Sequence, residues 1–443
     1  MLILYNGFEV LFYLLVIAAC SMVMYLVIFL TTRNAFRAGI ITSLMLLLFL
    51  FYEYLYENLL SFSLIGNYFP HAGFLMLFIF LLISFLIGRT KKDLLNVTVY
   101  LNILFAILIL FEGSCTSINY YKNAPFRKYI EKEGPIVPLQ DSSGMPDIYY
   151  IIFDSYTSPA ASKQYFNFAN SEMADSLMTH GFFVTTNSAS RFHDTHKCIS
   201  SVLNLSYSEE LDSLFSDGVL STAVYVRNIQ WSRTVKELLS HGYQFVDLSF
   251  FDLGNEKRYY DNSFMLSQNF LANALFRETR LSHYFLNEPS AIYKTDLDIL
   301  NRLQLIPDEP HANHVFVYAH LSVTHGPFYF DRNGKIFKDG RGPFPGDEKK
   351  NYIECIRFAN TRILKFVEKI TSSRKPSVII IQGDHGSRLL NDPNNKEKYS
   401  MFNACLFPGK DYSGMNDSIS PVNTFRLMLN KYFRDNYKIS NDN

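Results

Sequence analysis

Apolar residues dominate the first quarter of the chain, where they form four long runs. The runs cover approximately Phe8–Leu30, Phe36–Leu60, Tyr68–Gly88 and Leu94–Phe111. A helix needs roughly 20 apolar residues to cross a bilayer, and each run reaches or approaches that length. Glu53 and Glu57 interrupt the second run, so its apolar part is expected to end near Tyr52. The pattern predicts a bundle of four transmembrane helices within residues 1–113, in preference to buried helices of a soluble protein or a cleaved signal peptide.

Basic residues in the short loops predict the orientation of these helices. The first loop contains Arg33 and Arg37, and the third contains Arg89, Lys91 and Lys92, whereas the N-terminus and the second loop contain none. Lysine and arginine accumulate on the cytoplasmic side of membrane proteins, so loops one and three are predicted to be cytoplasmic. With an even number of spans, the rest of the chain is then outside the cytoplasm. We therefore expect a multi-pass protein of the cytoplasmic membrane.

The remaining three quarters alternate between strand-like and helix-like segments. The strand-like segments are Asp147–Phe153, Phe245–Leu248, Val315–Leu321, Val378–Ile381 and Met401–Phe407. The helix-like segments are Ala160–Thr179, Ser232–His241, Lys349–Ile370 and Val422–Phe433. Such alternation is typical of an α/β fold in which a mainly parallel sheet is sandwiched by helices. Residues 146–443 are predicted to form this domain, and the proline-containing residues 114–145 a linker.

Charge and cysteine content exclude several classes of protein. The 41 basic and 41 acidic residues balance, and few of them fall in residues 1–112, so no nucleic-acid-binding surface is indicated. The five cysteines are odd in number and none is spaced as Cys-x-x-Cys. Neither a disulfide framework nor a cysteine-ligated zinc site is therefore predicted.

Candidate chemistry lies where the predicted strands end. Asp154 follows the first strand, His320 and His325 accompany the third, and Asp384 and His385 follow the fourth. The carboxyl ends of parallel strands meet at one edge of a sheet, where open α/β sheets bind their ligands. Carboxylate and imidazole ligands without thiolate suit zinc, manganese or magnesium. The alternative is that all of them are ordinary turn residues. Glycines around the Asp-His pair are expected to permit tight backbone geometry and leave room for a metal or a phosphate.

A hydroxyl nucleophile is expected in the segment SASRFHDTHKCISSVLN, residues 188–204, which reads as a polar loop followed by a helix. Thr195 is placed where the helix would begin, so that backbone amides at the helix N-terminus would face an anion. A divalent ion beside this hydroxyl would activate it. The alternative is that Thr195 is only a helix cap.

Four motifs together resemble the alkaline phosphatase and sulfatase superfamily, in particular its membrane-embedded, sulfatase-like branch. PDIYYIIFDSY resembles the opening strand with its metal-binding aspartate, at Asp154. FVYAHLSVTHGPF resembles the substrate-side histidine segment, at His325, and IIIQGDHGSR the metal-binding pair, at Asp384 and His385. SPVNTFRLMLNKYF resembles the closing helix. The resemblance implies an alkaline phosphatase-like fold.

The same resemblance implies a threonine nucleophile nine residues before Asn204, which is Thr195. His193 and His196 stand where proline and an apolar residue are common, and their roles stay open between substrate contact, metal ligand and loop residue. Cys198 lacks the Cys-x-Pro-x-Arg setting in which sulfatases form formylglycine, so sulfate ester hydrolysis is disfavoured. Related transferases carry a glutamate at the position of Asp154 and commonly have five spans, which leaves the donor open.

Lipoteichoic acid synthases and phosphoethanolamine transferases belong to this branch, and the likeness implies their type of activity. The expected reaction transfers phosphoglycerol or phosphoethanolamine from a phospholipid to a cell-surface glycan or a lipid-linked acceptor. The expected site has Thr195, Asp154, Asp384 and His385 at the metal, which would be zinc or manganese ahead of magnesium. His325 would act on the phosphate or the leaving alcohol, and Arg388 would neutralise charge. The alternatives are a phosphodiesterase or sulfatase-type ester hydrolase of the same fold, and a non-catalytic scaffold in surface-polysaccharide assembly.

Overall fold

A computed structural model describes residues 7–52, 54–55, 72–122, 144–207, 218–254, 256, 289–373, 375–390, 396–433 and 435–439. The chain divides into two compact units, one comprising residues 1–133 and 262–288 and the other residues 134–261 and 289–443. The predicted end of the second apolar run, the start of the third and most of the predicted linker lie outside the described residues.

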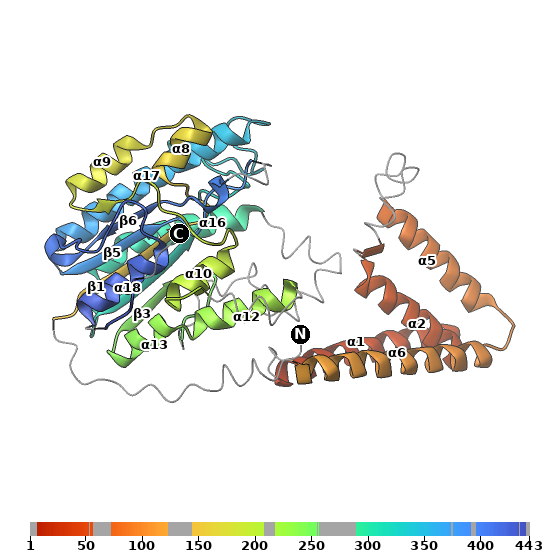
Figure 1. Ribbon diagram of the computed structural model, residues 1–443. Helices are drawn as coiled ribbons and strands as arrows, with labels where there is room; N and C mark the ends of the chain where they lie inside the picture. The colour runs from red at the N-terminus through yellow and green to blue at the C-terminus, as the bar shows by residue number, and fades with distance from the viewer. Residues whose placement is uncertain are drawn as a thin grey trace. The chain divides into compact units, whose positions relative to one another are not determined.

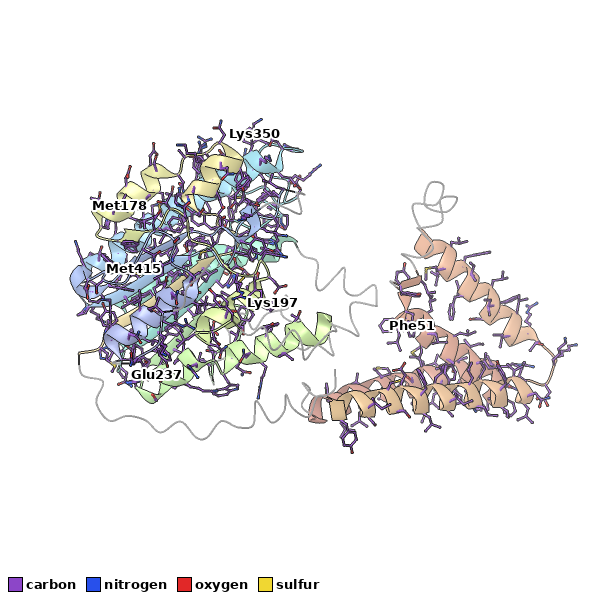
Figure 2. All side chains as sticks on the ribbon, viewed as in Figure 1. Phe51, Met178, Lys197, Glu237, Lys350 and Met415 are labelled. Atoms are coloured by element: carbon purple, nitrogen blue, oxygen red, sulfur yellow. The ribbon has the colours of Figure 1, made fainter. Side chains whose placement is uncertain are left out.

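The first unit contains four apolar helices, α1 (Gly7–Thr32), α2 (Ala35–Leu50), α5 (Ala72–Arg89) and α6 (Leu95–Lys122). Two of them include a segment long and apolar enough to cross a membrane, Leu14–Thr32 and Leu95–Cys115, and no residue of either segment is buried. Many apolar side chains of α5 and α6 are exposed, and Figure 2 shows side chains projecting along the length of both helices. Helices that are apolar all round require an apolar surrounding. The bundle of four transmembrane helices remains a prediction, because α2 and α5 are shorter.

Contacts within this unit centre on α2, which touches α1, α5 and α6. The guanidinium group of Arg37, at the start of α2, donates hydrogen bonds to the carbonyl oxygens of Gly88 (3.3 Å) and Thr90 (2.6 Å), at the end of α5. The two basic loops therefore lie at the same end of the unit. The last helix is longer than predicted, because α6 continues to Lys122 through residues that had been assigned to the linker.

The second unit is built on a six-stranded sheet with the order β2-β6-β5-β1-β4-β3 (Figure 1). The strands are β1 (Asp147–Phe153), β2 (Phe183–Val184), β3 (Gln244–Leu248), β4 (Val315–Leu321), β5 (Ser377–Gln382) and β6 (Asn403–Leu406). Strands β3, β4, β1 and β5 are parallel to one another, whereas β6 runs antiparallel to β5 and β2 antiparallel to β6. The mainly parallel α/β sheet is confirmed, with an antiparallel edge that was not predicted.

Helices cover both faces of the sheet. One core contains residues of α8 (Pro159–Phe166), α9 (Ser171–Thr179), α16 (Pro289–Leu305) and α17 (Glu348–Ser372). The other contains residues of α10 (Thr195–Leu203), α12 (Gly218–Gln230), α13 (Arg233–Ser240) and α18 (Pro421–Tyr432). The predicted single helix over 160–179 is wrong, because Asn167 takes a left-handed conformation (φ 51°) and ends α8.

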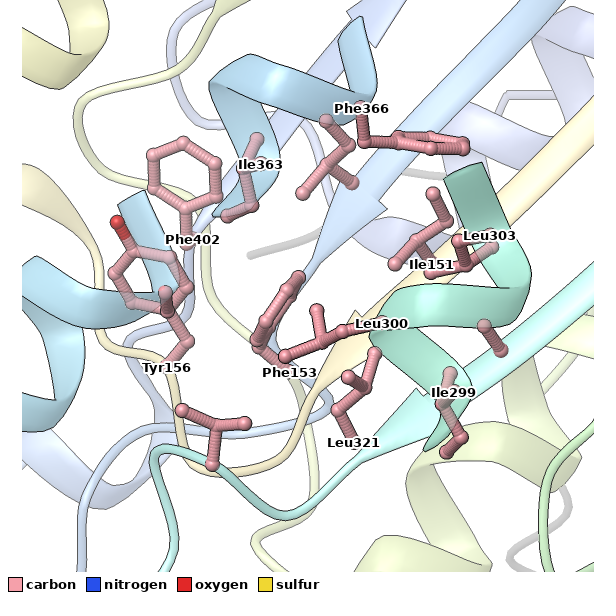
Figure 3. Close-up of a cluster of buried hydrophobic side chains, with 14 of the residues drawn as sticks. Ile151, Phe153, Tyr156, Ile299, Leu300, Leu303, Leu321, Ile363, Phe366 and Phe402 are labelled. Carbon is pink, nitrogen blue, oxygen red and sulfur yellow. The ribbon is translucent and has the colours of Figure 1, made fainter. Parts of the chain in front are cut away.

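Strand β1 separates the two cores by alternation of its side chains. Tyr149, Ile151 and Phe153 pack in the first core, part of which Figure 3 shows, and Ile148, Tyr150 and Ile152 pack in the second. Every residue of β1, β4 and β5 is buried. Strands buried on both faces read as continuous apolar runs, which explains why the sequence located them. The carboxyl ends of these three strands lie side by side and carry the candidate site.

Candidate metal centre and active site

The turn after β1 holds two carboxylates in place. Ser155, the residue after Asp154, has a left-handed backbone (φ 64°), which costs a residue other than glycine about 1–2 kcal/mol. In this conformation its hydroxyl donates a hydrogen bond to Oδ1 of Asp154 (3.0 Å) and its amide donates one to Oδ1 of Asp384 (3.0 Å). Thr324 donates a further bond, from its hydroxyl to the carbonyl oxygen of Asp154 (2.6 Å). One strained residue thus links carboxylates from two strands.

Glycines beside the Asp-His pair are required by neighbouring backbone. A Cβ atom on Gly383 would lie 2.3 Å from the carbonyl oxygen of Tyr156, and one on Gly386 would lie 1.9 Å from that of Glu397. These distances are shorter than any van der Waals contact. The expectation that the two glycines leave room for a metal or a phosphate is therefore corrected, since main chain fills that room.

The ring of His385 is oriented by its own main chain. Nδ1 lies 2.7 Å from the carbonyl oxygen of Gly386 and donates a hydrogen bond to it. In this tautomer Nε2 carries a lone pair. The Nε2 atom lies 3.3 Å from Oδ2 of Asp384 and 3.7 Å from Oδ1 of Asp154. A histidine held through Nδ1–H to a carbonyl is the usual arrangement of a metal ligand.

Ligand atoms of Asp154, Asp384 and His385 lie within 4.8 Å of one another, and all three residues are buried. Oδ2 of Asp384 is buried and, in the described part of the chain, accepts no hydrogen bond. Buried carboxylate oxygens normally accept a hydrogen bond from a donor. Here the two carboxylates face the lone pair of His385 Nε2, so these three groups offer one another no hydrogen. The donor set suits a divalent cation of the zinc, manganese or magnesium type.

Thr195 is the first residue of α10, and its hydroxyl lies 3.4 Å from Nε2 of His385. Its helix is capped by the Asp194 side chain, which accepts hydrogen bonds from the amides of His196 (3.1 Å) and Lys197 (3.4 Å). The adjacent His196 side chain holds the pKa of Asp194 down at about 2. Two of the amides that were expected to face an anion are thus occupied by a carboxylate of the same helix.

His193 and His196 flank Thr195 but lie outside the cluster of three ligands. The ring of His193 packs 5.4 Å from that of Tyr399, and burial lowers its pKa. The ring of His196 packs 5.7 Å from that of Phe251. Both side chains are partly exposed, and their roles remain predictions.

His325 and Arg388 form a pair. Nδ1 of His325 donates to the carbonyl oxygen of Gly326 (2.5 Å), and its Nε2 accepts a hydrogen bond from Nη2 of Arg388 (2.9 Å). The guanidinium group is exposed and the imidazole partly so. The two residues assigned to the substrate side are therefore in contact, and in this arrangement His325 offers no proton to a substrate.

Cys198 is buried one turn after Thr195. Its thiol donates to the carbonyl oxygen of Phe192 (3.3 Å) and accepts from the hydroxyl of Ser190 (3.2 Å). Burial raises the pKa of this thiol well above its usual value. A protonated, enclosed thiol is a poor nucleophile.

Sequence reasoning missed Ser155, Thr324 and Tyr318. Tyr318 contacts His320, whose Nδ1 lies 3.0 Å from the tyrosine hydroxyl and whose Nε2 lies 4.0 Å from Oδ2 of Asp154. Burial lowers the pKa of His320 to about 4. For Tyr318, the one signal in the sequence was the histidine two residues later in the apolar strand VFVYAHL. A buried histidine needs a polar partner, and Tyr318 is that partner.

Comparison with known proteins decides the family. The family model named Sulfatase matches residues 146–409, more than half of the chain. The chain belongs to the sulfatase family. This membership confirms the likeness to the alkaline phosphatase and sulfatase superfamily, and at that level it identifies a hydrolase or transferase. None of the curated proteins compared with this sulfatase-family chain matched it.

Several solved structures resemble the sulfatase-family chain at low sequence identity. The C-terminal periplasmic domain of EcEptC from Escherichia coli is 13% identical, with a TM-score of 0.43, over 68% of this chain and 86% of that one. The lipooligosaccharide phosphoethanolamine transferase EptA from Neisseria meningitidis is 11% identical, with a TM-score of 0.40, over 81% and 69%. The putative sulfatase yidJ from Bacteroides fragilis is 12% identical, with a TM-score of 0.42, over 66% and 75%.

Proposed function

We propose that this protein is a metal-dependent phospho-alcohol transferase of the cytoplasmic membrane, acting outside the cytoplasm through Thr195. The observation that carries the proposal is the hydroxyl of Thr195 beside the cluster of Asp154, Asp384 and His385. The nearby thiol of Cys198 is buried and turned to a main-chain carbonyl, which favours the hydroxyl as nucleophile.

The cluster would hold one divalent ion, with zinc or manganese ahead of magnesium. When bound, such an ion lowers the pKa of a neighbouring hydroxyl and neutralises charge on a phosphate. In the first step the Thr195 oxygen loses its proton and bonds to the donor phosphorus, and the bond to the lipid alcohol breaks, with that alcohol taking up a proton. In the second step an acceptor hydroxyl displaces threonine from phosphorus, and the threonine oxygen regains a proton.

Substrate binding would fall to the exposed side of the cluster. Arg388 offers a guanidinium group that binds phosphate oxygens in a bidentate manner, and its contact with His325 orients it. His325 would turn to the phosphate or the leaving alcohol once Arg388 engages the substrate. His193 and His196, which flank Thr195 in the chain and are partly exposed, would contact the head group.

The apolar helices support a membrane location. Loops one and three both carry basic residues, and the bonds from Arg37 to Gly88 and Thr90 bring them to one end of the unit. This agrees with a shared cytoplasmic side, which would leave residues 146–443 outside as the catalytic domain. The proposed donor is accordingly a phospholipid, and the proposed acceptor a surface glycan or a lipid-linked glycan.

Replacement of Thr195 tests the nucleophile. The full-length protein, reconstituted in vesicles of phosphatidylethanolamine or phosphatidylglycerol, is assayed for diacylglycerol release with and without a glycan acceptor. Thr195→Ala is expected to lose at least about a thousandfold in rate, because removal of a nucleophile leaves only binding effects. Thr186→Ala, at an exposed threonine of the preceding segment, is the matched control and should keep full activity.

The products distinguish transfer from hydrolysis. Release that depends on the acceptor indicates a transferase, whereas equal release without acceptor indicates a phosphodiesterase. Full activity of Thr195→Ala would refute the threonine mechanism altogether.

A further inference from the structure

His320 is a buried histidine whose two nitrogens face different neighbours. It lies in β4, directly beside Ile152 of β1, and its side chain is fully enclosed. The rings of Phe250 and Phe251 pack on it, with centroid distances of 4.7 and 6.1 Å. These rings keep water from the imidazole, so its hydrogen bonds must be made with protein groups.

The first neighbour, Tyr318, offers a hydrogen-bond donor to Nδ1, and the tautomer this favours also suits the carboxylate of Asp154, which can only accept. Its hydroxyl lies 3.0 Å from Nδ1 of His320. Burial raises the pKa of Tyr318 well above its usual value, so the phenol keeps its proton and has it available for Nδ1. When the phenol donates to Nδ1, the imidazole proton resides on Nε2.

The second neighbour is the carboxylate of Asp154. Nε2 of His320 lies 4.0 Å from Oδ2 of Asp154 and, within the described residues, has no hydrogen-bond partner. The other oxygen, Oδ1, accepts from Ser155 and lies on the side of His385. Asp154 thus has one oxygen toward the cluster and one toward His320.

We infer that His320 is a positioning residue, whose Nε2–H faces Oδ2 of Asp154 at 4.0 Å and attracts that oxygen electrostatically, so that Oδ1 is presented to the metal. Polar groups that orient a ligating carboxylate fix its rotamer and raise metal affinity, and their loss costs about 10–100-fold. The inference rests on the proposed metal site. It predicts that His320 itself does not bind the ion.

Metal binding by full-length protein in detergent tests this role without an activity assay. The chelator-stripped protein is titrated with Zn²⁺ against a chromophoric chelator, and with Co²⁺, whose absorption spectrum reports its ligands. His320→Leu is expected to bind Zn²⁺ about 10–100-fold more weakly than wild type. His320→Gln keeps a side-chain N–H and is expected to lose less, with an unchanged Co²⁺ spectrum.

Two further variants complete the design. His241→Gln replaces a buried histidine that bonds the carbonyl oxygen of Glu237, away from the cluster, and should bind metal as wild type does. Tyr318→Phe leaves the tautomer of His320 undetermined and should weaken binding less than His320→Leu. It also keeps the test decisive if His320→Leu fails to fold.

Three results would overturn the inference. Wild-type affinity in both His320 variants would show that the histidine does not act on Asp154. Equal losses in both variants, with an altered Co²⁺ spectrum, would make His320 a ligand instead of a positioning residue. Absence of metal binding by wild type would remove the proposed metal site itself, and the inference with it, which is distinguishable from the first two results.

Discussion

Asp384→Asn should separate metal binding from folding, because this substitution removes one of two buried carboxylate charges. The ligand oxygens of Asp154 and Asp384 lie within 4.8 Å of each other. At that separation two unit charges repel by about 3 kcal/mol in a medium with an effective dielectric constant of about 20. The asparagine Oδ1 can still accept the bonds that Ser155 and His385 donate from their amides (3.0 and 2.9 Å). The metal-free variant is therefore expected to be at least as stable as metal-free wild type.

Added metal should reverse this order. An ion present at 100 times its dissociation constant stabilises the folded state by about 2.7 kcal/mol, which corresponds to a rise in Tm of about 4 °C for a domain of this size. The asparagine variant lacks the charge and should show little rise. The assay is thermal unfolding of the full-length, detergent-solubilised protein, stripped with chelator and measured with and without Zn²⁺ or Mn²⁺.

Asp247→Asn is the matched control for this experiment. Asp247 is a buried aspartate in β3 with one oxygen that, in the described part of the chain, has no hydrogen-bond partner, but it is not part of the cluster. Its variant should retain the full metal-induced rise. An equal rise in Asp384→Asn and wild type would refute the assignment of Asp384 as a ligand, and a loss of metal-free stability in Asp384→Asn would refute the charge argument.

Two further predictions concern residues of the same α/β unit. Gly386→Ala should lower the free energy of unfolding by more than about 1–3 kcal/mol in a urea titration, because its Cβ would lie 1.9 Å from a main-chain oxygen. Gly346→Ala meets no atom within 4 Å and should lose less, only the roughly 1–2 kcal/mol that a left-handed backbone (φ 86°) costs alanine. Burial raises the pKa of Asp247 to about 8, so the folded state keeps this proton up to that pH while the unfolded state releases it near pH 4. Stability should accordingly fall as pH rises from about 4 to 8. Asp247→Asn should flatten this dependence in urea unfolding at pH 5, 6, 7 and 8, and an unchanged slope would contradict the argument.

Central strands were located well from sequence alone. The bounds of β1 and β4 agree with the apolar runs 147–153 and 315–321, because strands buried on both faces admit few polar residues. At the edge of the sheet, the segment 401–407 was predicted as a strand and contains β6 (Asn403–Leu406), but β2 and the direction of β6 were not predicted. β2 has two residues, too few for a pattern, and the antiparallel direction of β6 depends on how the chain returns, which apolar periodicity does not encode.

The candidate site was likewise predicted in part: the sequence indicated its residues but not all of their contacts. Asp154, Asp384 and His385 could be named in advance, because residues that follow parallel strands meet at one edge. Thr195 could be named from its place at a helix start, and the family resemblance supplied the meaning of its spacing to Asn204. The capping of that helix by Asp194 and the pairing of His325 with Arg388 could not, because side-chain rotamers decide them.

By itself, the sequence determined the apolar helices, the mainly parallel sheet and the strand ends that carry carboxylates and imidazoles, since these depend on local pattern. Only the tertiary structure decided the roles of Ser155, Gly386 and His320. Ser155 bonds a carboxylate that lies 229 residues away in the chain, and His320 faces Asp154 from the neighbouring strand, 166 residues further along the chain. Contacts of this kind are set when distant segments pack together, and no local pattern records them.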